Sequence, residues 1–290
     1  MNHSRRNFLK QSGLTLAGAG LLPALGASGR NALFQSPGKD GWPPFGFQSW
    51  TIREPLNADF GPTLEKMAGL GYSYVEMCSP LGYKESGFAA LNELTGKEIA
   101  SVVKGAGLIC NSSHFTMGEL RDHLENRIEW ARDVGMKQMV CSSFWLPDDA
   151  TLDDYRRAAG ELNRMGEQTA SAGLQMVFHN HHMEFEKRGD VLIYDALLEE
   201  FDPALVKMQF QVAVVDLGYQ AADYFRMHPG RFQSAHLADY STELEKQVAI
   251  GQGVVDWDDF FVAAKTGGVK NFYVEMAPEL FPPSAEFLSA

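Results

Sequence analysis

Apolar and polar positions follow one recurring order along the chain: an amphipathic segment, a glycine, then a short apolar run. Apolar runs led by glycine lie at residues 71–77, 107–115, 135–143, 173–180 and 267–276, and three further runs lie at 45–50, 206–212 and 231–239. Glycine just behind a helix can take the left-handed conformation that ends the helix, and a short apolar run is typical of a buried strand. The pattern predicts eight strands, each followed by a helix.

Two of the predicted helices begin with capping sequences. Thr116 and Glu119 are spaced as a capping box, and Thr151 and Asp154 open the next helix in a similar way. Strands that are apolar on both faces and alternate with helices indicate a parallel sheet. Eight such units predict an α/β fold of one domain, a closed (β/α)8 TIM barrel over residues 44–290. A doubly wound open sheet is the weaker alternative, because no glycine-rich phosphate loop follows the first strand. For the same reason we expect no nucleotide cofactor.

The first 29 residues resemble an export signal. Residues 4–10, SRRNFLK, match the twin-arginine consensus, and a mild apolar run too short to span a membrane follows them. No cysteine precedes Cys78, so a lipid anchor is not expected. Residues 30–43 are rich in Pro, Gly and Ser and are predicted to form a linker. We therefore expect export to the periplasm, with no membrane anchor after the signal is cleaved.

Composition narrows the choice of partners. The chain carries 37 acidic and 25 basic residues, for a formal net charge of −12. Such a surface repels nucleic acid, which also disfavours a DNA-repair endonuclease built on the same barrel. The three cysteines, Cys78, Cys110 and Cys141, have no disulfide-like spacing and are predicted to be buried.

Polar residues gather where the predicted strands end. Active sites of TIM barrels lie at the carboxyl-terminal ends of the strands. The segment 178–186, FHNHHMEFE, falls at one such end. The other ends add carboxylates, imidazoles and an aromatic ring that could stack on a sugar. Together these candidates are Trp50, Glu76, His114, His179, His181, Gln211, His236, Asp239 and Glu275.

Several short motifs carry a family resemblance that runs from about residue 45 to the C-terminus. They are HNHHMEF at 179–185, PGRF at 229–232 with HLAD at 236–239, GQGVVDW at 251–257 and YVEM at 273–276. With these motifs the chain resembles the sugar phosphate isomerase/epimerase family, the xylose-isomerase-like TIM barrels. The resemblance implies an enzyme that acts on a small carbohydrate, and many members of the family hold one divalent metal.

The resemblance also implies roles for individual residues. It makes Glu184, Gln211, His236 and Glu275 the expected metal ligands, with His179 or His181 as alternatives to Glu184, and it makes Glu184 and Glu275 the expected acid and base. The position of His181 at the barrel rim adds it to the expected catalytic residues. Trp50, Glu76, His114, His179 and Asp239 are the expected substrate contacts. Gln211 stands where the family usually has Asp, and its neutral amide binds a hard cation more weakly than a carboxylate does. The expected ion is Mn²⁺, Zn²⁺ or Mg²⁺.

The function expected from the resemblance is proton abstraction beside the carbonyl group of a sugar, keto-sugar or cyclitol, as in isomerases and epimerases. Two alternatives stay open. One is a lyase or dehydratase that acts on keto-glycosides or an inosose. The other is a sugar-binding protein without catalytic activity, because Gln211 and Ala238 both remove charge from the expected site. Without a basic group beside the loop at 251–257, a free sugar or glycoside is a better substrate than a sugar phosphate.

Changing Arg5 and Arg6 together to Lys should keep the protein in the cytoplasm, because the arginine pair is the element that the export receptor reads. Fractionation of cells that express either form checks this expectation. Normal export of the double variant would show that residues 1–29 are not a twin-arginine signal.

Overall fold

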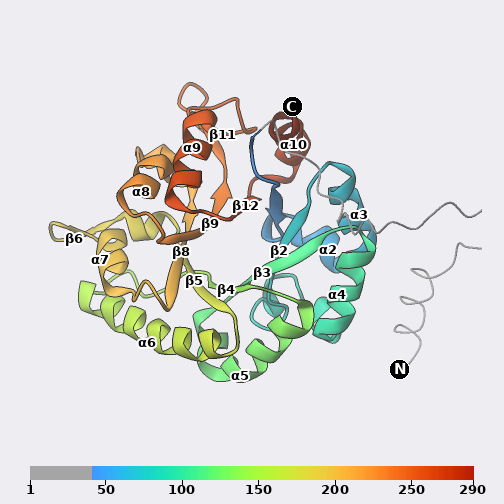
Figure 1. Ribbon diagram of the computed structural model, residues 1–290, viewed down its shortest axis with the longest axis horizontal. Coiled ribbons are helices and arrows are strands. Elements are labelled where there is room, and N and C mark those ends of the chain that lie inside the picture. The colour runs from blue at the N-terminus through green and yellow to red at the C-terminus, as the bar shows by residue number, and fades with distance from the viewer. Residues whose placement is uncertain (1–40) are drawn as a thin grey trace, which may run out of the picture. The chain divides into compact units, whose positions relative to one another are not determined.

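The eight predicted strands form one closed parallel barrel in the computed structural model, which describes residues 41–290 (Figure 1). Neighbours around the barrel are β1, β2, β3, β4, β5, β8, β9 and β12, and β12 pairs with β1 to close it. The strands are β1 (Gly46–Gln48), β2 (Tyr74–Cys78), β3 (Ile109–Phe115), β4 (Gln138–Cys141), β5 (Gln175–His179), β8 (Val206–Gln211), β9 (Phe232–Leu237) and β12 (Asn271–Val274). The predicted (β/α)8 barrel is confirmed. The predicted leader at 1–29 and linker residues 30–40 lie outside the described residues.

Helices surround the barrel, with at least one after every strand (Figure 1). They are α2 (Arg53–Ala58), α3 (Phe60–Gly69), α4 (Gly96–Gly105), α5 (Met117–Val134), α6 (Leu152–Ser171), α7 (Ile193–Glu200), α8 (Ala221–Met227), α9 (Trp257–Gly267) and α10 (Phe281–Ser289). Within residues 41–290, no helix is long and apolar enough to cross a membrane.

The helix starts follow the capping sequences in part. At α6 the reciprocal box is complete, because Thr151 accepts a hydrogen bond from the Asp154 backbone and Asp154 accepts one from Thr151. At α5, Thr116 caps the Glu119 backbone, but the Glu119 carboxylate accepts a hydrogen bond from the Ser79 hydroxyl instead. Only half of the box predicted at Thr116 is therefore formed.

The barrel core accounts for a glycine in β1 and for the three cysteines. Gly46 in β1 lies so near β2 that a Cβ atom there would stand 2.7 Å from the Cβ of Tyr74, so no larger residue fits without movement. Cys78, Cys110 and Cys141 are free and buried, as predicted.

Two antiparallel hairpins were not predicted. The β6 (Lys187–Arg188) and β7 (Val191–Leu192) pair follows β5, and the β10 (Asp239–Ser241) and β11 (Lys246–Val248) pair follows β9. Both hairpins follow the carboxyl-terminal end of a barrel strand. We call this end of the barrel, where the strands finish, the mouth.

Candidate functional site

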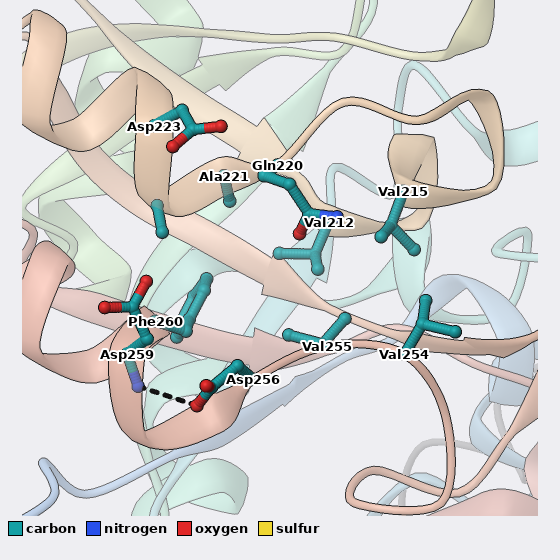
Figure 2. A pocket seen from close by; sticks show the side chains of 11 residues that line it. Val212, Val215, Gln220, Ala221, Asp223, Val254, Val255, Asp256, Asp259 and Phe260 are labelled. Carbon is teal, nitrogen blue, oxygen red and sulfur yellow. Dashed lines mark hydrogen bonds between the residues drawn. The ribbon is translucent and has the colours of Figure 1, made fainter.

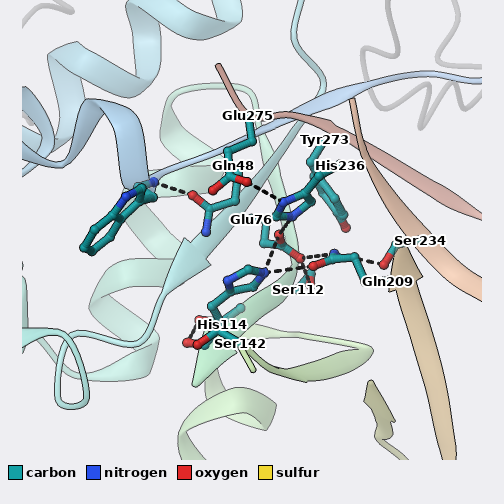
Figure 3. Close-up of polar contacts among 12 residues, drawn as sticks. Gln48, Glu76, Ser112, His114, Ser142, Gln209, Ser234, His236, Tyr273 and Glu275 are labelled. Atoms are coloured by element: carbon teal, nitrogen blue, oxygen red, sulfur yellow. Dashed lines mark hydrogen bonds and ion pairs between the residues drawn. The ribbon is translucent and has the colours of Figure 1, made fainter. Parts of the chain in front are cut away.

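Glu76, His236 and Glu275 meet in the barrel from three strand ends (Figure 3). His236 Nδ1 lies 2.9 Å from Glu275 Oε2, and its Nε2 pairs with the Glu76 carboxylate. The side chains of Glu76 and His236 have no solvent exposure, whereas that of Glu275 is 16% exposed. The group therefore leads from the barrel interior toward the mouth, and Glu275 is its outermost member.

Charge pairing fixes the protonation of these three residues. Burial alone would lower the pKa of His236, but the adjacent carboxylates of Glu275 and Glu76 raise it to about 9. Burial would likewise raise the pKa of Glu275, yet His236 holds it at about 2. The pKa of Glu76 is also lowered against the effect of burial, by His114 and His236. At neutral pH this is an imidazolium between two carboxylates.

A layer of neutral polar side chains below this group was not predicted. Gln209 Nε2 donates to Glu76 Oε1 and to Ser234 Oγ, both at 2.9 Å, and Gln209 Oε1 lies 2.8 Å from His114 Nε2. Ser112 donates to Glu76 and accepts from Gln138 Nε2 at 2.8 Å. The sequence spacing could have predicted this layer. Each of its members Ser112, Gln209 and Ser234 lies two residues before a predicted site residue and therefore faces the same side of its strand.

His179 lies beside the same group but is not part of its hydrogen-bond network. Its ring centroid is 4.3 Å from that of His236 and 4.9 Å from that of His114. The ring is fully buried, and neither of its nitrogens has a hydrogen-bond partner. Burial first, and then the neighbouring imidazoles, hold the pKa of His179 well below its usual range. A neutral imidazole is thus buried near the Gln209 backbone but without a well-formed hydrogen bond at either nitrogen, which is unusual in a folded protein.

His114, His179 and His236 together could hold a metal ion. One nitrogen from each ring lies within 4.8 Å of the other two. Glu76 contacts both His114 and His236, and carboxylates that orient histidines in this way are common around metal sites. The unpartnered nitrogens of His179 fit the same interpretation. The residues present are therefore compatible with a divalent metal held by imidazoles.

Gln211 contacts the site through Glu275. Its Nε2 donates to Glu275 Oε2 at 2.6 Å, and its Oε1 accepts from the Ala213 backbone at 3.2 Å. The amide oxygen, which is the atom that would bind a metal, is already used by the backbone. The structure makes Gln211 a hydrogen-bond partner of Glu275.

Glu184 and His181 lie just beyond β5. Both oxygens of the buried Glu184 carboxylate are used, one by Ser143 Oγ and the other by the His181 backbone N–H at 2.7 Å. Burial raises the pKa of Glu184 to about 7, although the hydrogen bonds from Ser143 and His181 act to lower it. Its carboxylate thus holds the loop that carries His181 and bonds none of the three clustered histidines.

His181 itself stands at the mouth. Its ring centroid is 4.8 Å from that of His179 on one side and 4.8 Å from that of Trp145 on the other. Burial is the main cause that lowers the pKa of His181 to about 4, so the ring is neutral at physiological pH. Its neighbour His182 is exposed and pairs with Asp216 on the surface.

Asp239, an expected substrate contact, is instead enclosed by its own loop. Its carboxylate accepts hydrogen bonds from the backbone of Tyr240, Gly251, Gly253 and Val255 and from Trp257 Nε1, over 2.9–3.2 Å. A Cβ atom on Gly253 would lie 2.1 Å from Asp239 Oδ1, so the glycine lets the loop approach closely. These contacts indicate that Asp239 organises the loop from β10 to α9.

Trp50, the aromatic ring expected to stack on substrate, is partly covered. The Arg53 guanidinium lies 4.4 Å from the centre of its ring, and Arg53 Nη1 donates to its carbonyl at 2.8 Å. Tyr83 meets the ring edge-on at 5.8 Å. Part of the indole is therefore used in packing.

A separate pocket of about 260 Å³ lies between the loop after β8 and the start of α9 (Figure 2). Its walls carry apolar side chains from Val212, Val255 and Phe260, together with Asp223 and Asp259. None of the expected site residues lines this pocket, so we do not assign it to the site.

The chain is similar to known proteins in family, sequence and fold. A family model described as "Xylose isomerase-like TIM barrel" matches residues 64–289. An inosose dehydratase of Geobacillus thermodenitrificans is 27% identical over an alignment of 147 residues, and the match covers 44% of this chain and 49% of the relative. The chain thus matches about half the length of that relative.

Solved structures share the fold. A sugar phosphate isomerase/epimerase from Parabacteroides distasonis superposes with a TM-score of 0.72 at 24% identity, and the match covers 85% of this chain and 93% of that one. The IolI protein with a bound zinc atom superposes with a TM-score of 0.62 at 15% identity, covering 85% and 94%.

Replacing Asp239 with Ala should lower the free energy of unfolding by at least about 3 kcal/mol, because five donors lose a charged acceptor and several become unsatisfied. Asp239→Asn should lie between wild type and Ala. Urea denaturation measures both.

Asp216→Ala is the matched control, because it removes a surface pair and should change stability by less than about 1 kcal/mol. If Asp239→Ala is as stable as this control, Asp239 does not hold the loop and its expected substrate role returns.

Proposed function

Because the chain belongs to the xylose isomerase-like TIM barrel family, we propose that it is an enzyme that removes a proton beside the carbonyl group of a sugar, keto-sugar or cyclitol. The observation that carries the proposal is the Glu275–His236–Glu76 group, which runs from the mouth into the barrel. Only Glu275 in this group has an exposed side-chain surface, which a substrate can reach. Members of the family and the relatives found are enzymes, which supports catalysis over binding alone.

Glu275 and His181 form the proposed acid–base pair. They lie at the ends of β12 and β5, which are separated in the barrel by β9 and β8, so they approach a bound substrate from different sides. One of them takes the carbon-bound proton, the electron pair moves to the carbonyl oxygen, and an enediolate forms. Return of the proton completes the reaction. Glu184 acts as a positioning residue through its hydrogen bond to the His181 backbone.

A divalent metal is the proposed cofactor, held by His114, His179 and His236. Of the expected ligands this set keeps His236 and leaves out Glu184, Gln211 and Glu275. Both His236 nitrogens are paired with carboxylates, so a metal at His236 would displace Glu76 or Glu275 from one of them. Imidazole donors suit Zn²⁺ better than Mg²⁺, and the zinc in IolI supports that choice. Such a cation polarises a carbonyl oxygen and stabilises an enediolate. Metal binding would release the proton that His236 otherwise carries.

A lyase or dehydratase reaction is the second candidate. The similarity to an inosose dehydratase favours it, although the matched region is less than half of this chain. Isomerisation, epimerisation and elimination share the same proton abstraction, so the roles given to Glu275 and His181 hold for all three.

The metal-free wild-type protein should bind Zn²⁺ more tightly than Mg²⁺, and His179→Ala should weaken Zn²⁺ binding by at least about tenfold, the scale seen when metal-site residues are changed. Isothermal titration of the stripped proteins measures both affinities directly, without an activity assay.

His182→Ala is the matched control, because it removes a neighbouring histidine that lies on the surface and outside the cluster. Equal Zn²⁺ affinity in wild type and His179→Ala, with tight binding in both, would exclude the imidazole site. No binding by wild type would exclude the metal.

With the native substrate in deuterated water, the enzyme should catalyse incorporation of deuterium at carbon. Glu275→Gln and His181→Ala should each slow this exchange by about 100-fold or more, the usual contribution of a general acid or base. NMR over a panel of keto-sugars, keto-glycosides and inososes measures the exchange.

His182→Ala should exchange at the wild-type rate, and all three variants should keep a thermal midpoint within a few degrees of wild type. If sugars bind but none shows exchange, the chain is a sugar-binding protein and the enzymatic proposal fails.

A further inference from the structure

The turn after β4 holds two residues in a conformation that side chains rarely adopt. Ser143 has φ 80° and Trp145 has φ 51°, and among residues 41–290 the only other non-glycine residue with positive φ is Glu245. The left-handed region is unfavourable for residues with a Cβ atom. Such conformations persist where the surrounding structure imposes them, and they gather at ligand sites.

Contacts of the two residues before Trp145 hold this turn in place. The Ser143 hydroxyl donates to the Glu184 carboxylate. Phe144 is buried, with its ring centroid 4.7 Å from that of Phe178. With both preceding residues anchored inward, the backbone turns Trp145 outward.

Trp145 is left largely in solvent. Its side chain is 56% exposed, and within the described part of the chain it is the only Trp, Tyr or Phe that is classed as exposed. Burying this indole in the core would stabilise the fold, because large aromatic rings contribute most of the apolar surface that a core removes from water. Exposure on an imposed turn indicates that the ring serves a purpose other than core packing.

Trp145 is also the outer end of a line of rings, which we call the ring column: Trp145, His181, His179 and His236. Successive ring centroids are 4.8, 4.8 and 4.3 Å apart. The first ring is exposed, His181 is half-buried, and the last two are fully buried. The column therefore joins the surface to the proposed reaction centre without a break.

We propose that Trp145 is the stacking platform of an outer subsite, which binds the second ring of a keto-glycoside whose carbonyl-bearing sugar lies over His236 and Glu275. This inference rests on the proposed function and narrows its substrate class from a single sugar to a glycoside with a ring-shaped aglycone. An indole offers a flat apolar face to the C–H face of a sugar ring or to an aromatic ring. Trp145 binds and does not take part in the proton transfer.

The test compares glycosides that differ only in the second ring. The probes are methyl and phenyl glucopyranosides and a glucose disaccharide, each in both anomeric forms, with phenol and glucose as separate fragments. Isothermal titration measures dissociation constants for the wild type, Trp145→Ala and Trp145→Phe. Met227→Ala, which removes an exposed apolar side chain on α8, is the matched control.

At least one phenyl glycoside or disaccharide should bind the wild type tenfold or more tightly than the methyl glycoside of the same anomer. Trp145→Ala should abolish this preference without changing the affinity for the methyl glycoside. Trp145→Phe should keep part of it, and Met227→Ala should keep all of it. Preference for the phenyl glycosides alone identifies an aromatic aglycone, and preference for the disaccharides identifies a sugar.

Equal affinity of wild type and Trp145→Ala for every ring glycoside overturns the inference, as does the absence of any ring-glycoside binding or equal binding of phenol alone. The proposed function fails separately. Trp145-dependent binding without deuterium exchange would exclude the proposed proton abstraction and keep the subsite. Exchange on a single sugar at the same rate in wild type and Trp145→Ala, with no preference for ring glycosides, would exclude the subsite and keep the proposed proton abstraction.

Discussion

The carboxylate of Glu76 lies inside the barrel with no exposure to solvent, and its charge must be compensated there. An unpaired carboxylate at such a depth would be very costly. Its oxygens accept hydrogen bonds from Ser112 and Gln209 and contact His114 and His236. These partners come from β3, β8 and β9, so one charge fixes side-chain orientations on four neighbouring or facing strands, including its own. The rest of the site is built on this arrangement.

One consequence is a gradient of polarity along the barrel. The interior holds amides and hydroxyls with fixed hydrogen bonds, the next level holds imidazoles, and the mouth holds Glu275 and His181. His236 links these levels, because it contacts Glu76 on the inside and Glu275 on the outside. A ligand that enters from the mouth therefore meets side chains that are already oriented, which is the preorganisation that electrostatic catalysis requires.

The sequence predicts the side-chain direction of site residues on the barrel strands, but not the surroundings of site residues in the loops after them. The two-residue period indicates which strand positions face inward, and the structure brings Glu76, His114, His179 and His236 into contact there. Glu184 lies past the end of β5, where a short 3₁₀ helix (His182–Phe185) turns it toward Ser143. Asp239 is surrounded by backbone amides from up to 16 residues further along the chain. Neither environment follows from periodicity, because loop geometry decides both.

Gln211 shows how one neutral side chain changes the charge balance of the whole site. A carboxylate at this position would stand beside Glu275, whose Oε2 now accepts the Gln211 amide at 2.6 Å, and the two negative charges would repel unless a cation lay between them. The amide removes this repulsion and leaves Glu275 neutralised by His236 alone. Glu275 therefore requires a metal cation beside it less than it would with a carboxylate at position 211. Unsatisfied groups remain on the histidines, at both nitrogens of His179 and at Nδ1 of His181, and a metal ion or a hydrogen-bonding ligand bound there would satisfy them.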